Sequence, residues 1–128
     1  MSTSATPQPI PGYSPARAAG DLVYVSGVLG IDPSTGKIPD GDFSHEAHQA
    51  MQNLLENAAK AGATAADIVK TTIYVTTFDV YGEFDQIYRT YFPGALPARA
   101  TVQVAGLLAG ALVEGEAVAW LNTAASTD

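Results

Sequence analysis

The chain carries Pro97-Ala98-Arg99-Ala100-Thr101-Val102-Gln103-Val104 and, a few residues later, Leu112-Val113-Glu114-Gly115-Glu116-Ala117-Val118-Ala119-Trp120. Side chains of different character alternate in both segments, which is typical of β-strands that have one buried face. The pattern predicts strands over residues 98–105 and 112–121. Because only residues 106–110 would connect them, we expect the two strands to form a hairpin.

Two more strands are expected nearer the N-terminus. Residues 22–27 are rich in β-branched and aromatic side chains, which predicts a strand that ends at Gly27. A second short extended piece is expected through Leu29 and Ile31. Residues 68–77 contain mainly Thr, Ile, Val and Tyr, and they predict a further strand.

Two amphipathic helices separate these strands. Apolar residues recur at helical spacing over residues 44–60, with Asp42 or Ser44 as the capping residue. A second apolar stripe follows Asp79, which is expected to cap that helix, and it ends before Pro93. This order of elements predicts an α+β fold, a mixed β-sheet with two main helices packed on one face.

Composition narrows the functional classes. The 128 residues are enough for one compact domain, and the formal net charge is −7. The six Lys and Arg residues are scattered singly, whereas binding to a phosphate backbone needs clustered basic residues. We therefore expect no nucleic-acid partner. The low surface charge and the many small apolar residues suit a domain that buries part of its surface in an oligomer.

The same sequence predicts a cytoplasmic protein with no membrane partner. Cysteine is absent, and no apolar run reaches the length of a membrane span. Residues 1–11 lack the features of a signal peptide and are expected to form a flexible N-terminal arm. Residues 12–123 are expected to form the single domain, followed by a short tail over residues 124–128.

The two strands quoted first also carry the candidate chemistry. Arg99 is one of three arginines in an acidic chain, and it suits the binding of an anion. Glu114 and Glu116 share a strand face with apolar neighbours, a setting that can raise carboxyl pKa values. The alternative is structural: Arg99 forms a surface salt bridge with one of the two glutamates, and such a bridge contributes little. The spacing leaves both interpretations open.

No metal site is expected. His45 and His48 lie three residues apart in the first predicted helix, without a third ligand in the pattern. Because zinc sites use three or four protein ligands, we interpret both histidines as solvated helix residues.

The segments 97–102 and 114–119 resemble the signature of the RidA/YjgF/UK114 family. Residues 20–27 and 67–75 also resemble blocks of that family, in the same order. The resemblance extends from Tyr13 to Trp120. It implies a chorismate-mutase-like fold of the bacillus type, assembled as a homotrimer with sites in the clefts between subunits. It also implies hydrolysis of reactive 2-imino or enamine acids to 2-keto acids and ammonia.

The resemblance further implies a role for each site residue. Arg99 would bind the substrate carboxylate, and Glu114 would activate the attacking water and shuttle protons. Backbone groups at Gly27 and Thr101 would orient the substrate, and Tyr13 would close one wall. The complete substrate-binding set is Tyr13, Ser26, Gly27, Arg99, Ala100 and Thr101. No cofactor is expected, because an iminium carbon is already electrophilic and water needs only placement and proton transfer.

Some residues depart from the family pattern. Val28 replaces a common Gln, Leu108 a common Pro, Gly115 a common Ile, and Asp85 a common Asn. Asp85 would add negative charge beside the anion site if it lined the cleft. An alternative function is a non-catalytic trimer, chaperone-like or binding small carboxylates. An RNA-cleaving activity, sometimes ascribed to this family, fits the acidic charge poorly.

Overall fold

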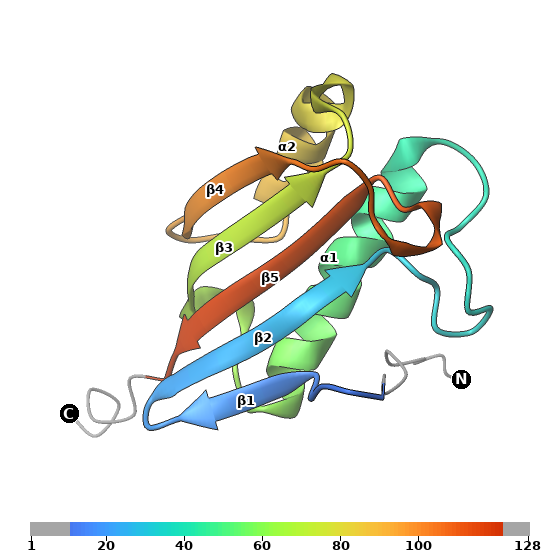
Figure 1. The fold of residues 1–128 in the computed structure, drawn as a ribbon. Coiled ribbons are helices and arrows are strands. Elements are labelled where there is room, and N and C mark those ends of the chain that lie inside the picture. Colours follow the sequence, from blue (N-terminus) through green and yellow to red (C-terminus); the bar gives the residue numbers. More distant parts are fainter. Residues whose placement is uncertain (1–10, 122–128) are drawn as a thin grey trace.

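A computed structural model describes residues 11–121, which form one five-stranded sheet with two helices behind it (Figure 1). The strands are β1 (Ala16–Ala19), β2 (Leu22–Leu29), β3 (Ile68–Val75), β4 (Ala98–Gln103) and β5 (Val113–Trp120). The helices are α1 (Phe43–Lys60) and α2 (Tyr81–Arg89), with 3₁₀ turns η1 (Ala65–Asp67), η2 (Phe78–Val80) and η3 (Leu108–Gly110). The predicted α+β class with both helices on one face is confirmed.

The strand order is β1-β2-β5-β3-β4, so the predicted hairpin of the last two strands is wrong. β4 pairs in parallel with β3, and β5 lies antiparallel between β2 and β3. β5 is central because it pairs with a strand on each side, whereas β4 pairs with β3 alone among the described strands and forms an edge. The segment β3-α2-β4 is thus a crossover unit, as parallel neighbours require.

The N-terminal strands also differ from the prediction. β1 was not predicted, because its Ala-Arg-Ala-Ala sequence has little strand propensity. It pairs with β2 through a turn at Gly20, whose φ is 61°. The two expected extended pieces are one strand, β2, which continues past Gly27. The strand continues through a β-bulge, in which the two residues between Val25 and Val28 lie opposite a single residue of β5.

The helices begin close to their predicted positions. Asp42 caps α1, and its carboxylate accepts a hydrogen bond from the Ser44 amide. Asp79, in contrast, does not cap α2. It lies inside η2, where its own amide donates to the Thr77 hydroxyl, and α2 follows directly.

The hydrophobic core lies between the sheet and the helices. α1 covers β2 and β5, and α2 packs beside α1. Gly115 faces this core at the centre of β5, where an added Cβ would lie 3.3 Å from Ile73 Cδ1 and 3.8 Å from Leu54 Cδ2. The largest fully buried side chains are Phe84, Met51, Leu54, Ile73, Val23, Val75, Val113 and Thr71.

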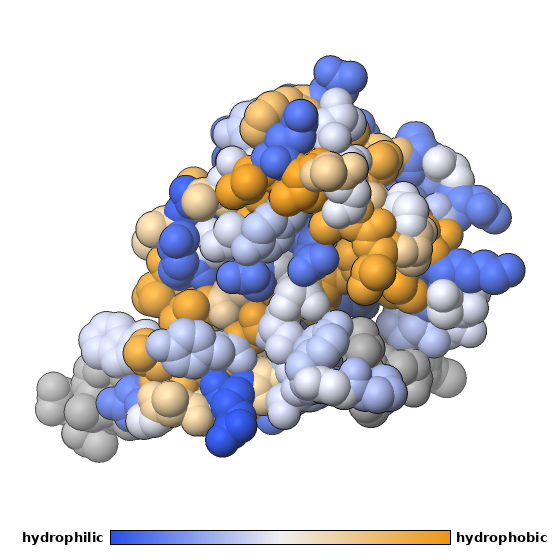
Figure 2. All heavy atoms as spheres, in the orientation of Figure 1, coloured by the Kyte–Doolittle hydropathy of each residue, from blue (hydrophilic) through white to orange (hydrophobic). Residues whose placement is uncertain are grey.

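The other face of the sheet is not covered by any of residues 11–121. Tyr24, Val102 and Trp120 lie on it and are each between 42% and 49% exposed. Figure 2 shows this face, where apolar residues gather around the connection between β4 and β5. No helix within the described range is long and apolar enough to cross a membrane. The cytoplasmic location stays a prediction. The predicted arm over residues 1–11, except Pro11, and the tail over residues 124–128 lie outside the described residues.

A buried carboxylate fixes the start of β5. Glu46 of α1 is 4% exposed, and its Oε2 accepts hydrogen bonds from the amides of Leu112 (2.7 Å) and Val113 (3.2 Å). Gly30 leaves room for this arrangement, because a Cβ there would overlap the Glu46 backbone. Val113, the residue before Glu114, is therefore held by the Glu46 side chain of α1.

We expect Glu46→Ala to lower the free energy of unfolding by about 2–5 kcal/mol, because it leaves two amides at the start of β5 without their acceptor. Glu46→Gln keeps an acceptor oxygen and should lose markedly less. Urea denaturation of both variants measures the difference. An equal loss in Glu46→Gln, which keeps the side-chain volume and one acceptor oxygen, would show that the carboxylate charge, and not hydrogen-bond acceptance alone, stabilises this junction.

Candidate functional site

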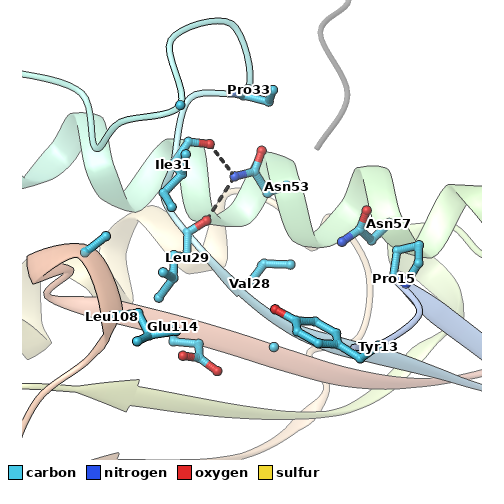
Figure 3. Close-up of a pocket in the computed structure, with 13 residues that line it drawn as sticks. Tyr13, Pro15, Val28, Leu29, Ile31, Pro33, Asn53, Asn57, Leu108 and Glu114 are labelled. Atoms are coloured by element: carbon cyan, nitrogen blue, oxygen red, sulfur yellow. Dashed lines mark hydrogen bonds between the residues drawn. The ribbon is translucent and has the colours of Figure 1, made fainter. Parts of the chain in front are cut away.

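Glu114 borders a cavity of about 380 Å³ between β2, the start of β5 and α1 (Figure 3). Most of the wall is apolar, and Glu114 contributes the one carboxylate. The lining residues are Tyr13, Pro15, Gly27, Val28, Leu29, Ile31, Pro33, Gly36, Asn53, Asn57, Leu108, Ala109 and Glu114. A mainly apolar cavity with a few polar groups is typical of small-molecule sites.

The bulge in β2 provides the space for the Glu114 carboxylate. Ser26 and Gly27 form the bulge opposite Glu116. A Cβ on Gly27 would overlap Glu114 Oε2, so only glycine allows the carboxylate to lie against this strand. The bulge also interrupts the regular ladder at Gly27, where its backbone lines the cavity.

The electrostatic environment of Glu114 favours its protonated form. Burial raises the pKa of Glu114 above its ordinary value, and the nearby charge of Glu116 raises it further. The Tyr74 hydroxyl donates to Glu116 Oε1 at 3.2 Å. Burial and the two glutamates also raise the pKa of Tyr74, which keeps that hydroxyl protonated as a donor. Glu114 therefore holds a proton more readily than an exposed glutamate does.

Tyr13 lies across the cavity from Glu114, with its hydroxyl directed toward the middle of the cavity (Figure 3). Ser26 holds the segment that carries it. The Ser26 hydroxyl donates to the Ser14 carbonyl at 2.6 Å, and the Ser26 amide donates to the Pro15 carbonyl at 3.0 Å. The hydroxyl proton of Ser26, a predicted substrate-binding residue, is thus already used to position the Tyr13 segment.

Two asparagines of α1 form the far wall. Asn53 Nδ2 donates to the carbonyls of Leu29 (2.9 Å) and Ile31 (2.8 Å), which fixes the chain beyond β2. Asn57 is 4% exposed, and its Oδ1 has no hydrogen-bond partner among the described residues. Because a buried acceptor without a partner is costly, this wall favours a water or a ligand donor.

Arg99 lies in a second pocket, lined by Phe78, Tyr81, Arg99 and Thr101. Its Nη2 contacts Asp85 Oδ1 at 2.8 Å and donates to the Tyr81 hydroxyl at 2.9 Å. Its Cζ lies 4.6 Å from the ring centroid of Tyr88. Burial, the largest influence, lowers the pKa of Arg99, but Asp85 and Tyr81 outweigh it and the net pKa is raised. The guanidinium therefore stays charged.

The sheet separates the two predicted catalytic residues within one chain. Arg99 pairs in register with Thr71 and faces the helices, whereas Glu114 pairs with Tyr74 on the open face. β3 also lies between their strands. The salt bridge considered between Arg99 and a glutamate is therefore wrong, and Asp85 is the partner. Of the other predicted residues, Thr101 lines the Arg99 pocket, and Ala100 lies on the opposite face of β4.

Asp85 was placed beside the anion site only as a condition, and Tyr81 and Tyr88 were not predicted to contact Arg99, although a signal for all three existed. Tyr81, Asp85 and Tyr88 lie at spacings of four and three residues along α2, which places them on one helical face. The Tyr88 hydroxyl lies 2.7 Å from the Thr71 hydroxyl and links this face to β3. The sequence spacing places these three residues on one face of α2, but the strand that this face contacts depends on the strand order of the sheet.

The fold and the two pockets define a small α+β protein that carries a guanidinium paired with Asp85 and a partly buried carboxylate on opposite faces of a mixed sheet. The family described as Endoribonuclease L-PSP matches residues 3–121. The chain belongs to this family, which is the RidA/YjgF family.

Individual relatives agree with this assignment. A rat protein named 2-iminobutanoate/2-iminopropanoate deaminase is 44% identical over 119 residues, covering 93% of this chain and 87% of the rat protein. A human protein of the same name is 39% identical, with the same coverage of 93% and 87%. The crystal structure of a Rid-family protein from Yersinia pestis is similar with a TM-score of 0.85 and 38% identity, covering 93% of this chain and 95% of that one.

We expect Gly27→Ala to displace the Glu114 carboxylate toward solvent, because the new methyl group takes its place. The pKa of Glu114 should then fall toward its ordinary value, which a carbon-13 NMR titration of the carboxyl group measures. Gly106→Ala is the matched control, because a Cβ there meets nothing within 4 Å. An unchanged Glu114 pKa in Gly27→Ala would contradict the role of the glycine.

Proposed function

We propose that this protein is a deaminase that hydrolyses 2-imino acids to 2-keto acids and ammonia, in sites shared between the subunits of a homotrimer. The observation that carries the shared site is the separation of Arg99 and Glu114 by the sheet. One chain cannot present both residues to one small substrate, whereas two neighbouring chains can. The rat and human relatives carry the corresponding deaminase name.

The open face of the sheet supports such an assembly. Tyr24, Val102 and Trp120 leave large apolar side chains half-exposed there. β4 is an edge strand with a neighbour on one side only. Contiguous exposed apolar surface and unpaired strand edges are features that oligomers cover. We propose that further copies of this chain cover them, in the chorismate-mutase-like trimer that the family resemblance implies.

In the proposed site, Arg99 of one subunit holds the substrate carboxylate. Glu114 of a neighbour faces the imine carbon. The substrate enters with its imine nitrogen already protonated. The Glu114 carboxylate takes a proton from water as the water oxygen bonds to that carbon, which leaves a neutral amino group and a hydroxyl group on the carbon. Glu114 then returns its proton to the amino nitrogen. The C–N bond breaks and ammonia leaves, while the hydroxyl proton passes to Glu114 and the carbonyl of the 2-keto acid forms. A carboxyl group with a raised pKa suits both the removal of a proton from water and the return of that proton to the nitrogen.

The remaining residues position the substrate in this proposal. The backbone at Gly27 lines the cavity beside Glu114, and Thr101 lies beside Arg99. The apolar wall around Glu114 suits the hydrocarbon side chain of the substrate. The description of the matching family refers instead to cleavage of RNA. The six basic residues are scattered and the net charge is −7, so charge does not favour RNA as a substrate.

We expect the protein to accelerate ammonia release from 2-iminobutanoate generated in the assay. Arg99→Ala and Glu114→Gln should each lose about a hundredfold or more in kcat/KM, because each removes one half of the site. Co-expression of the two inactive variants tests the shared site. About a quarter of the sites in randomly mixed trimers should hold both intact residues, because each site draws one residue from each of two subunits.

Recovery of activity in the mixed trimers, with none in either variant alone, is the expected result. Inactive mixtures that still form trimers, as measured by light scattering and mass spectrometry, would show that the site does not combine residues from two chains. An unmodified protein that does not accelerate any imine hydrolysis would rule out the deaminase activity itself.

The activity should also depend on pH through Glu114. Because its raised pKa must be exceeded before it can act as a base, the acid limb of kcat/KM should lie above the ordinary glutamate pKa. Glu116→Gln removes a nearby negative charge and should shift that limb to lower pH. The exposed Glu83→Gln is the control and should leave the profile in place. A shift of the Glu116→Gln limb to higher pH would contradict the assignment of Glu114 as the base.

A further inference from the structure

Arg99 is already partnered within its own chain. Asp85 Oδ1 lies 2.8 Å from Nη2, and the Tyr81 hydroxyl accepts from the same nitrogen at 2.9 Å. One guanidinium Nη group carries two hydrogens, so these two partners use both. Asp85 is itself held in place, because its Oδ2 lies 3.2 Å from Arg89 Nε.

This arrangement conflicts with two-point binding of a ligand carboxylate. A carboxylate binds a guanidinium through two parallel N–H groups on neighbouring nitrogens. In arginine these pairs are Nη1 with Nη2 and Nε with Nη2, so both include the nitrogen that Asp85 and Tyr81 occupy. A ligand carboxylate must therefore displace Asp85 or Tyr81 from Nη2, or bind by a single contact through Nη1 or Nε.

The competition takes place in a partly desolvated site. The side chains of Arg99 and Asp85 are 16% and 25% exposed, so their charges are screened less than those of a surface pair. The Tyr88 ring covers one side of the guanidinium. The negative charge of Asp85 therefore acts both on Arg99 and on any anion that approaches it.

We propose that Asp85 is a specificity-determining residue that weakens binding of anionic carboxylates at Arg99 and so favours release of the 2-keto acid product. The proposal rests on the proposed function for the identity of the ligand. A protonated imino acid carries a positive nitrogen beside its carboxylate and has no net charge. The keto acid has a net charge of −1 and is repelled more strongly by Asp85. Substrate and product are thereby distinguished by charge.

The test is calorimetric titration of the assembled protein with 2-oxobutanoate. We expect Asp85→Asn to bind this keto acid about tenfold more tightly than the parent protein, since a competing charge is removed while a similar shape is kept. Glu83→Gln is the matched control, because it removes an exposed acidic group from the same helix. The double variant Asp85→Asn/Arg99→Ala should lose the gain, which shows that it acts through Arg99.

Affinity in Asp85→Asn that equals or falls below that of the parent overturns the proposal, as does binding too weak to detect in both proteins. A gain that persists in the double variant also overturns it. The deaminase activity is tested separately, because ammonia release is measured without reference to keto acid binding. In Asp85→Asn, inhibition by the added keto acid should strengthen by more than the change in kcat/KM for the imine.

Discussion

Side chains alternate across each strand, and in a sheet with helices on one side only this alternation decides where every functional group lies. On β5, small and apolar residues face α1, and Glu114 and Glu116 face the open side. On β4, Arg99 and Thr101 face α2. The core thus takes one face of each strand, and the chemistry is divided between the two faces. A single chain then places Arg99 and Glu114 on opposite faces of the sheet, which is the arrangement that the proposed assembly would complete.

The Glu114 site depends on several local departures from regular structure. A bulge in β2 places Gly27 beside the carboxylate, and Glu46 holds the start of β5 from the other side. Ala109 adopts a φ of 60° in the turn η3 at the cavity edge, a conformation that costs roughly 1–2 kcal/mol for residues other than glycine. The residues of η3 are exposed, and Leu108 is 79% exposed, so little packing surrounds this conformation.

The sequence predicted most of the elements and the face on which each residue of β4 and β5 lies, because alternation and helical spacing are local properties. It did not predict the order of the strands. Residues 106–110 are as short as a hairpin connection, but β5 pairs with β2 and β3, and alternation along a strand does not show which strands lie beside it. The charge of Asp85 at the Arg99 site could be raised only as a condition for the same reason, since Asp85 meets Arg99 only when α2 crosses over to β4. Short-range patterns do not encode such long-range pairing.

The electrostatics of the two half-sites are complementary. Arg99 is charged but paired with Asp85, so its pocket carries little net charge. Glu114 is partly desolvated beside Glu116, so it binds a proton more readily than an exposed glutamate does. In the proposed shared site, the Arg99 guanidinium would bind the substrate carboxylate in competition with Asp85, and the Glu114 carboxyl group would accept and donate a proton. Such a site is matched to a zwitterion, whose positive nitrogen offsets its carboxylate. It is poorly matched to the keto acid, from which that positive nitrogen has been lost. The same two residues can therefore hold the reactant long enough for proton transfer and still release the product.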